Sequence, residues 1–278
     1  MSMKVWPHGQ RWIGSFLLFV ALSLSLLKVV GEAHAVPNGG YAHPEILIQP
    51  EDLRVLIEKK ASNIRIIDVR ENLQYLTGHI PEAVQLWRPD IEDKNHSIPG
   101  MMAPQTQIEE LLGSLGVNNK DTIIIYSDLY DHVRLWWIFA YYGFPLHQMK
   151  LLDGGIDAWK AKGYPIEMIP PVVKKTRFEF GEKAKKITPL ICTLGEVKSA
   201  LKEPKRVVLD VRSKKEYLGE EIKKGALKGG RIPGVTWIEW KEVIVEEGPF
   251  KNYWKSAAEI KKIFSGKGVT PDKDVYIY

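Results

Sequence analysis

The only cysteine of the chain, Cys192, is the one side chain that could act as a thiolate nucleophile. A single cysteine cannot form an intramolecular disulfide. The residues from Thr193 to Glu196 form a capping-box pattern, which predicts that a helix starts there. Cys192 would then lie just before the helix, where it can pack against Val197. We therefore expect Cys192 to be buried and structural.

Ser127 is a second candidate nucleophile, because it follows an apolar run at residues 122–126. His132 is the nearest possible general base in the sequence. Asp128, next to the serine, would oppose an anionic substrate. We interpret Ser127 as part of a loop that has no catalytic role.

Two Asp-x-Arg pairs, Asp68 with Arg70 and Asp210 with Arg212, lie 142 residues apart. Each pair ends an apolar run and is typical of charges that fix the turn after a strand. Arginine also offers a forked set of donors to an anion such as a thiosulfonate. If the second half of the chain is catalytic, Arg212 and Arg231 are the candidate substrate-binding residues.

Composition and charge favour neither a nucleic-acid-binding nor a metal-binding protein. The chain has 39 basic and 34 acidic residues and a net charge of +5, with the lysines dispersed. No metal site is expected, because Asp153 followed by two glycines is typical of a turn after a strand. A small anionic substrate is compatible with this charge.

Residues 1–35 have the features of a secretory signal sequence. A positive start precedes an apolar stretch at 13–27, and Ala33-His34-Ala35 is a small-x-small cleavage site. The apolar stretch is short for a membrane span, which needs roughly 20 residues. We expect export to the periplasm or secretion and no stable membrane insertion after cleavage, although retention of the segment as an anchor is the alternative. Without it, 36 basic and 33 acidic residues remain, a net charge of +3.

The rest of the chain contains two copies of one pattern. Each copy has an apolar run ending in Asp-Val-Arg, then Tyr-Leu, then Gly-x-Ile-Pro, and later Gly-Val before a second apolar run. The offset is 142 residues at the aspartates and 152 residues from Gly-x-Ile-Pro onward, so the second copy contains a ten-residue insertion. We infer an internal duplication.

The apolar runs and the segments between them predict the fold class. Short β-branched runs predict buried strands at 64–69, 122–126, 149–152, 206–211 and 274–278. Helical patterns occur at 50–60, 105–115, 133–142, 156–162 and 256–264. Alternating strands and helices predict an α/β fold in which each copy is a parallel sheet flanked by helices.

These motifs resemble those of the tandem rhodanese family. The Asp-Val-Arg, Tyr-Leu and Gly-His-Ile-Pro series is similar to the first signature of a rhodanese domain, and residues 151–159 resemble its closing signature. The Arg-Leu-Trp-Trp segment that starts at Arg134 resembles the first, usually inactive, domain of tandem members. The resemblance covers residues 44–278 and places Ser127 and Arg134 in the degenerate loop region of that domain.

The resemblance implies a sulfurtransferase with a non-catalytic domain at 44–170, a linker at 171–188 and a catalytic-type domain at 189–278. Such an enzyme moves a sulfane sulfur from thiosulfate or 3-mercaptopyruvate to cyanide or a thiol acceptor through a cysteine persulfide. No metal or organic cofactor is expected. The family's cysteine would follow Tyr278 directly, so we expect the sequence to be truncated before the active-site loop, and the 278-residue chain to be inactive.

Two other functions stay open at this point. The chain could be a non-catalytic rhodanese-fold protein that binds a partner or a small anion. It could also resemble the phosphatase relatives of the fold, which have a longer loop around the cysteine. The residue that follows Tyr278 and the length of its loop would distinguish these possibilities. The sulfur donor, the acceptor and the oligomeric state are not predicted.

Overall fold

The computed structural model describes residues 40–180 and 190–278. The predicted signal sequence at 1–35 and residues 181–188 of the predicted linker lie outside the described residues. Within the described ranges, no helix has the length and apolar character needed to cross a bilayer.

The first sheet has five parallel strands in the order β1-β5-β4-β2-β3. The β-branched runs of the sequence form its centre, where β2 pairs with β4. Ile64 lies opposite Thr122 at one end of this pairing, and Asp68 lies opposite Tyr126 at the other. The strands are β1 (Leu47–Ile48), β2 (Ile64–Asp68), β3 (Val84–Gln85), β4 (Thr122–Tyr126) and β5 (Met149–Leu152).

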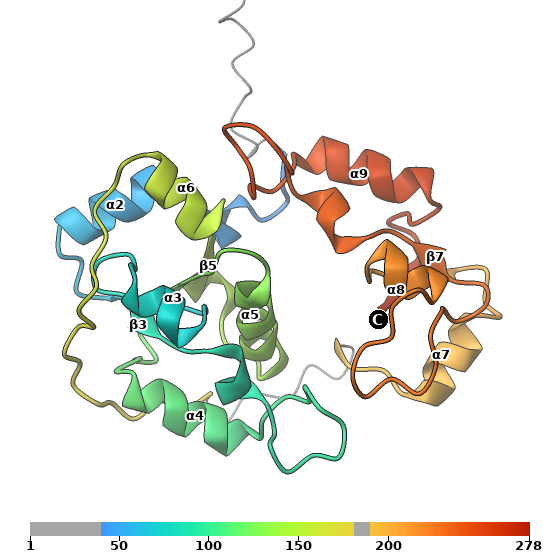
Figure 1. Cartoon of the computed structure of the whole chain (residues 1–278), viewed down its shortest axis with the longest axis horizontal. Helices are drawn as coiled ribbons and strands as arrows, with labels where there is room; N and C mark the ends of the chain where they lie inside the picture. The colour runs from blue at the N-terminus through green and yellow to red at the C-terminus, as the bar shows by residue number, and fades with distance from the viewer. Residues whose placement is uncertain (1–39, 181–189) are drawn as a thin grey trace, which may run out of the picture. The chain divides into compact units, whose positions relative to one another are not determined.

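Helices cover both faces of this sheet (Figure 1). Because side chains alternate along a strand, Ile123 and Ile125 pack in one core with α4 and α5, while Ile124 and Tyr126 pack in the other with α2 and α6. The α-helices are α2 (Pro50–Glu58), α3 (Asn72–Leu76), α4 (Gln105–Ser114), α5 (Asp131–Tyr141) and α6 (Gly155–Ala161), and the short 3-10 helices are η1 (Pro44–Ile46), η2 (Arg88–Ile91) and η3 (Leu146–Gln148).

The second sheet is smaller and has three parallel strands in the order β7-β6-β8. They correspond to β3, β2 and β4 of the first sheet, and Ile263 and Phe264 pack against the core of this second sheet. The elements are α7 (Leu194–Ala200), β6 (Arg206–Asp210), α8 (Lys214–Leu218), β7 (Thr236–Trp237), η5 (Trp240–Val243), α9 (Ala257–Gly266) and β8 (Asp274–Ile277). The predicted α/β fold class is confirmed.

Strand β8 differs from its counterpart β4 in burial. β4 lies between β2 and β5, and Ile123, Ile124 and Ile125 are fully buried. β8 lies at the edge of its sheet, where Val275 and Ile277 are 39% and 61% exposed. This edge is uncovered because the second sheet has no counterpart of β5 among the described residues.

The residues that begin the predicted linker pack against the first core. Phe178 and Phe180 are buried and lie edge-on against Phe139. The backbone N–H of Thr176 donates to the carbonyl of Gly113 at 2.9 Å, and a Cβ on that glycine would lie 2.7 Å from the Thr176 carbonyl oxygen. The close approach therefore requires glycine at 113. The domain boundary at 170 stays a prediction.

Candidate active site

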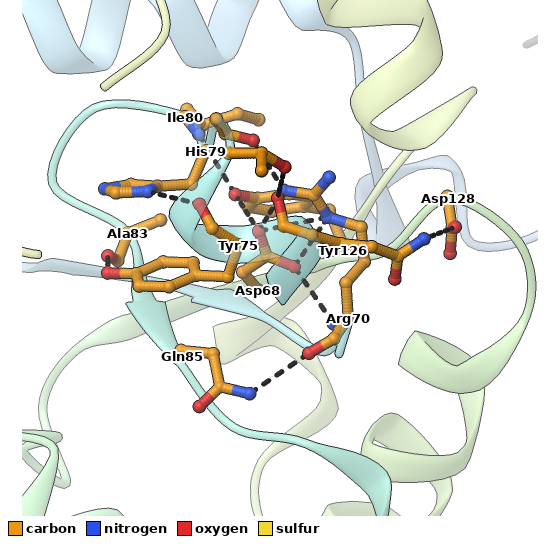
Figure 2. A network of polar contacts seen from close by, with 12 residues as sticks. Asp68, Arg70, Tyr75, His79, Ile80, Ala83, Gln85, Tyr126 and Asp128 are labelled. Carbon is orange, nitrogen blue, oxygen red and sulfur yellow. Dashed lines mark hydrogen bonds and ion pairs between the residues drawn. The ribbon is translucent and has the colours of Figure 1, made fainter. Parts of the chain in front are cut away.

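A buried polar network lies at the carboxyl end of β2 and β4 (Figure 2). Asp68 accepts hydrogen bonds from Nε and Nη2 of Arg70 at 2.9 and 2.6 Å and from the hydroxyl of Tyr126 at 2.7 Å. Arg70 Nη2 also donates to the carbonyl of Gly78 at 2.8 Å, and the Tyr126 hydroxyl accepts the N–H of Ile80 at 3.0 Å. The network fixes the Gly-His-Ile-Pro turn onto the strand ends.

The same network recurs at the end of β6 and β8. Asp210 accepts from Nε and Nη2 of Arg212 at 3.0 and 2.7 Å. Arg212 Nη2 donates to Gly230 at 2.9 Å, and Ile232 N–H donates to the Tyr278 hydroxyl at 3.2 Å. The predicted structural role of both Asp-Arg pairs is confirmed.

The two networks differ in burial and so in their electrostatics. The side chain of Arg70 is 4% exposed, whereas that of Arg212 is 30% exposed. Burial raises the pKa of Tyr126 well above its usual value. Burial tends to raise the pKa of Asp210, but hydrogen bonds from Arg212 outweigh it and lower that pKa. Burial also raises the pKa of Tyr278.

The loop that follows β4 contains the predicted Ser127 and His132, and the structure brings them together. Ser127 Oγ lies 2.7 Å from His132 Nδ1 and accepts the N–H of Leu129 at 3.2 Å. Both side chains are buried, and burial lowers the pKa of His132 to about 4. Asp128 accepts from Gln74 at 2.8 Å. A buried hydroxyl beside this carboxylate favours the structural interpretation of the loop.

A cleft of about 790 Å³ opens where this loop faces the second network. One side is formed by residues 129–134, which include the start of α5. The other includes Arg212 and Tyr278 at the ends of β6 and β8, with Trp240 and Trp254. The charged side chains that line it are Arg88, Arg134, Arg212 and Lys223 against Asp131 and Glu216. The excess of cations makes it suitable for a small anion.

A turn of the second copy packs onto the loops that follow β4 and β5. Asn252 Nδ2 donates to the carbonyl of Asp128 at 3.3 Å and to Asp157 Oδ2 at 2.9 Å. The N–H of Trp254 donates to Asp153 Oδ1 at 3.0 Å, and Asp153 also accepts from Gln49 at 3.0 Å. Burial raises the pKa of Asp153. The Asp153 carboxylate, at the predicted turn after β5, therefore accepts hydrogen bonds from both copies.

The predicted substrate-binding residues do not lie together. Arg212 lines the cleft, whereas Arg231 is not among the described residues that line it. The guanidinium of Arg231 instead lies 4.4 Å from the ring centroid of Tyr217 and donates to the carbonyl of the same residue at 3.5 Å. Arg134, predicted in the degenerate loop region, does line the cleft.

The prediction that Cys192 is buried was wrong. Its position before the helix is as expected, because Thr193 caps α7 in a capping box with Glu196. The thiol is nevertheless exposed, and Val197 is only half-buried. The exposure extends over residues 191–196, which include the first turn of the seven-residue helix α7. Cys192 is also not among the described residues of the cleft.

Only one of the two ring nitrogens of His79 has a hydrogen-bond partner among the described residues. Its ring stacks on Tyr75 at 3.9 Å, and Nδ1 lies 2.9 Å from the Tyr75 carbonyl, which is the backbone contact expected for a turn residue. Nε2 is buried and has no partner among the described residues. No pattern in the sequence predicted this unsatisfied atom.

Sequence reasoning missed Arg88, Lys223 and Trp240 in the cleft. Arg88 and Trp240 begin η2 and η5 and are 152 residues apart, so they occupy equivalent positions. Trp240 packs on Tyr130 with ring centroids 4.5 Å apart. Extending the repeat alignment past Gly-x-Ile-Pro could have singled out this position, although not the contact.

Residues 49–162 match the family described as Rhodanese-like domain. The chain is 30% identical to the sulfur carrier protein TtuD of Thermus thermophilus, over 86% of this chain and 84% of that protein. It is 25% identical to a thiosulfate sulfurtransferase of Corynebacterium glutamicum, over 85% and 78% of the two chains. The fold matches the crystal structure of SseA from Escherichia coli, among the 3-mercaptopyruvate sulfotransferases, with a TM-score of 0.69, 23% identity and coverage of 84% and 87%.

Proposed function

The chain belongs to the tandem rhodanese family of sulfurtransferases, and on that premise we propose that it moves a sulfane sulfur from thiosulfate or 3-mercaptopyruvate to cyanide or a thiol acceptor. The proposed carrier is a cysteine persulfide at the position directly after Tyr278. Membership of the family supports sulfur transfer, whereas the donor, the acceptor and the persulfide carrier are proposed.

One observation carries the proposal: Tyr278 directly follows β8, at the position equivalent to Tyr126 at the end of β4, and it lines the cationic cleft. The backbone of Val211 donates to the Tyr278 carbonyl at 3.1 Å, as Val69 donates to Tyr126 at 2.9 Å. The residue after Tyr126 is Ser127, and its loop leads into the N-terminus of α5. A thiol in the equivalent position would begin a loop at the cleft.

The proposed reaction has two displacements at sulfur. The thiolate attacks the outer sulfur of thiosulfate, the S–S bond breaks, and sulfite leaves with the electron pair. Cyanide then attacks the outer sulfur of the persulfide, thiocyanate forms, and the thiolate is regenerated. A loop that leads into a helix N-terminus would aim backbone N–H groups at the thiolate and favour the anion. No external oxidant or reductant is required.

The test begins with the coding sequence past codon 278. A cysteine in the next position, and a mass increase of one sulfur atom on that cysteine after incubation of the extended protein with thiosulfate, are the expected results. Serine, aspartate or a stop in that position would contradict the proposal and favour a non-catalytic binding protein. So would a cysteine that gains no sulfur.

We also propose that the protein is exported and that residues 1–35 are removed. The supporting observation is the charged, apolar and small-residue order of this segment. N-terminal sequencing of the protein from its native host should begin at Val36. A protein that retains Met1 or its immediate neighbours would contradict cleavage.

A further inference from the structure

The insertion that distinguishes the second copy from the first forms a projecting loop. It comprises residues 219–229, between α8 and the Gly-x-Ile-Pro turn. A Cβ on Gly219 would lie 2.9 Å from the backbone nitrogen of Gly230, so the two ends of the loop come together. Residues 222–229 are all exposed. The loop therefore presents its side chains to solvent and contributes none of them to the core.

The exposed side chains of this loop are aliphatic or basic. Leu227 is 100% exposed and Ile222 is 59% exposed. Lys224 and Lys228 flank the leucine in the sequence, and within the described parts of the chain neither has a carboxylate in salt-bridge distance. Aliphatic side chains that are grouped among polar ones, rather than scattered singly, are typical of an interaction surface.

A loop of the first copy lies beside the insertion. A Cβ on Gly225 would lie 3.7 Å from Cδ of Pro99, so the tips of the two loops are neighbours. Ile98, next to this contact, is 59% exposed. Each copy thus contributes exposed aliphatic side chains to the same place. We call the side chains of residues 94–100 and 220–228 the loop surface.

The loop surface carries more positive than negative charge. Apart from a histidine, its ionisable side chains are those of Lys94, Lys223, Lys224 and Lys228 against Glu220 and Glu221. Lys223 pairs with Glu221 at 2.5 Å. Asp93, which borders the surface, is half-buried and accepts the N–H of Asn95 at 2.9 Å. The unpaired lysines therefore make this surface complementary to an anionic partner.

The composition of the loop surface favours a lipid bilayer over a protein as that partner. Protein interfaces are enriched in aromatic residues and arginine and are poor in lysine. The loop surface has several lysines and no arginine, phenylalanine, tyrosine or tryptophan. At an anionic bilayer, aliphatic side chains leave water at the boundary of the acyl chains while lysine ammonium groups stay among the headgroups.

We propose that the loop surface binds the protein peripherally to a bilayer that contains anionic phospholipids. Ile98, Ile222 and Leu227 would enter the headgroup region, and the lysines beside them would contact the lipid phosphates. Lys223 also lines the cleft, so the bound protein would hold the cleft close to the membrane. This inference does not depend on the proposed sulfur transfer.

The test measures co-sedimentation with vesicles of the proposed mature form, which begins at Val36 and contains every described element. Residues 1–35 are left out because an apolar signal sequence would itself enter bilayers. Vesicles made of equal parts phosphatidylcholine and phosphatidylglycerol should bind the protein at least tenfold more tightly than phosphatidylcholine alone. Lys224→Gln combined with Lys228→Gln should weaken binding to the anionic vesicles at least tenfold. Leu227→Ser should weaken it severalfold, and this loss should persist at high salt.

The matched control is Lys261→Gln combined with Lys262→Gln. It removes two exposed lysines from α9, makes the same change in net charge and should leave vesicle binding unchanged. Circular dichroism checks that each variant is folded, and the Lys224 and Lys228 variant decides the question if Leu227→Ser is not.

An equal loss in the control would overturn the inference, because net charge alone would then explain the binding. Equal affinity for both kinds of vesicle, or no binding to either, would also overturn it. Undiminished binding by folded Leu227→Ser would contradict the entry of aliphatic side chains into the bilayer. A protein that binds polyglutamate but not the anionic vesicles would assign the loop surface to an acidic protein and would overturn the inference as well.

Discussion

Ser127 Oγ and His132 Nδ1 lie 2.7 Å apart in a buried loop, at the position where the second copy is proposed to continue into its cysteine. The hydroxyl accepts the N–H of Leu129, and it can donate its own proton to Nδ1 of the neutral imidazole. The pair thus links the residue after β4 to the first turn of α5.

Acid should destabilise the protein through His132. Burial lowers its pKa from 6.5 to about 4, so between these values the unfolded chain binds a proton that the folded chain does not. The free energy of unfolding should therefore fall by roughly 3 kcal/mol from this group as the pH drops from about 6.5 to 4. Urea unfolding of the native chain and of His132→Asn across this range measures the difference. Equal pH dependence in the two proteins would refute the assignment.

The two equivalent arginines should differ in their contribution to stability. Removing Arg70 leaves the buried carboxylate of Asp68 without its ion-pair partner, and we expect Arg70→Ala to cost about 3–5 kcal/mol. Arg212 is partly exposed, so water can solvate Asp210 in Arg212→Ala, and about 1–2 kcal/mol is expected. Chemical denaturation of both variants gives the comparison. A larger loss with Arg212→Ala would contradict the difference in burial.

Gly155 should be far less replaceable than Gly163, although both have positive φ, +56° and +67°. A Cβ on Gly155 would lie 2.1 Å from the Ser127 carbonyl oxygen, whereas nothing lies within 4 Å of one on Gly163. Gly163→Ala should cost only the left-handed backbone penalty of roughly 1–2 kcal/mol. Gly155→Ala should cost at least twice that, because the loop after β4 must move. Thermal melting that showed equal losses would exclude the steric explanation.

Asn252 should restrain the loop after β4. Asn252→Gly keeps the left-handed backbone, at φ +69°, and removes the hydrogen bonds to Asp128 and Asp157. Amide hydrogen exchange at residues 127–131 should become faster, while Asn95→Ala, an exposed substitution in another loop, should leave it unchanged. No difference between the two variants would show that the second copy does not restrain this loop.

Sequence reasoning reached the fold because the relevant information is local. The strands at 64–68, 122–126 and 206–210 are β-branched runs between polar turns, and they form the paired centres of the two sheets. The Asp-x-Arg spacing of two residues likewise predicted a turn-fixing ion pair, since both side chains come from one strand end.

The residues that line the cleft were harder to predict from the sequence, because they come from segments that lie far apart in the chain. The contact between Asp128 and Asn252 joins residues 124 positions apart, and nothing near either one indicates the other. The burial of Cys192 was predicted from a local capping pattern, but burial depends on whether another element covers the short helix. The packing of Phe178 and Phe180 was missed for a similar reason, because prolines and lysines around them are typical of a linker.

The most direct test of the account is cyanide-dependent thiocyanate formation from thiosulfate, measured for the chain extended past codon 278 and for the 278-residue chain. We predict turnover by the extended chain, loss of turnover when the cysteine after Tyr278 is changed to serine, and no turnover by the 278-residue chain. Thiocyanate formation by the 278-residue chain that Cys192→Ser abolishes would contradict the account, since it would move the chemistry to the exposed thiol outside the cleft.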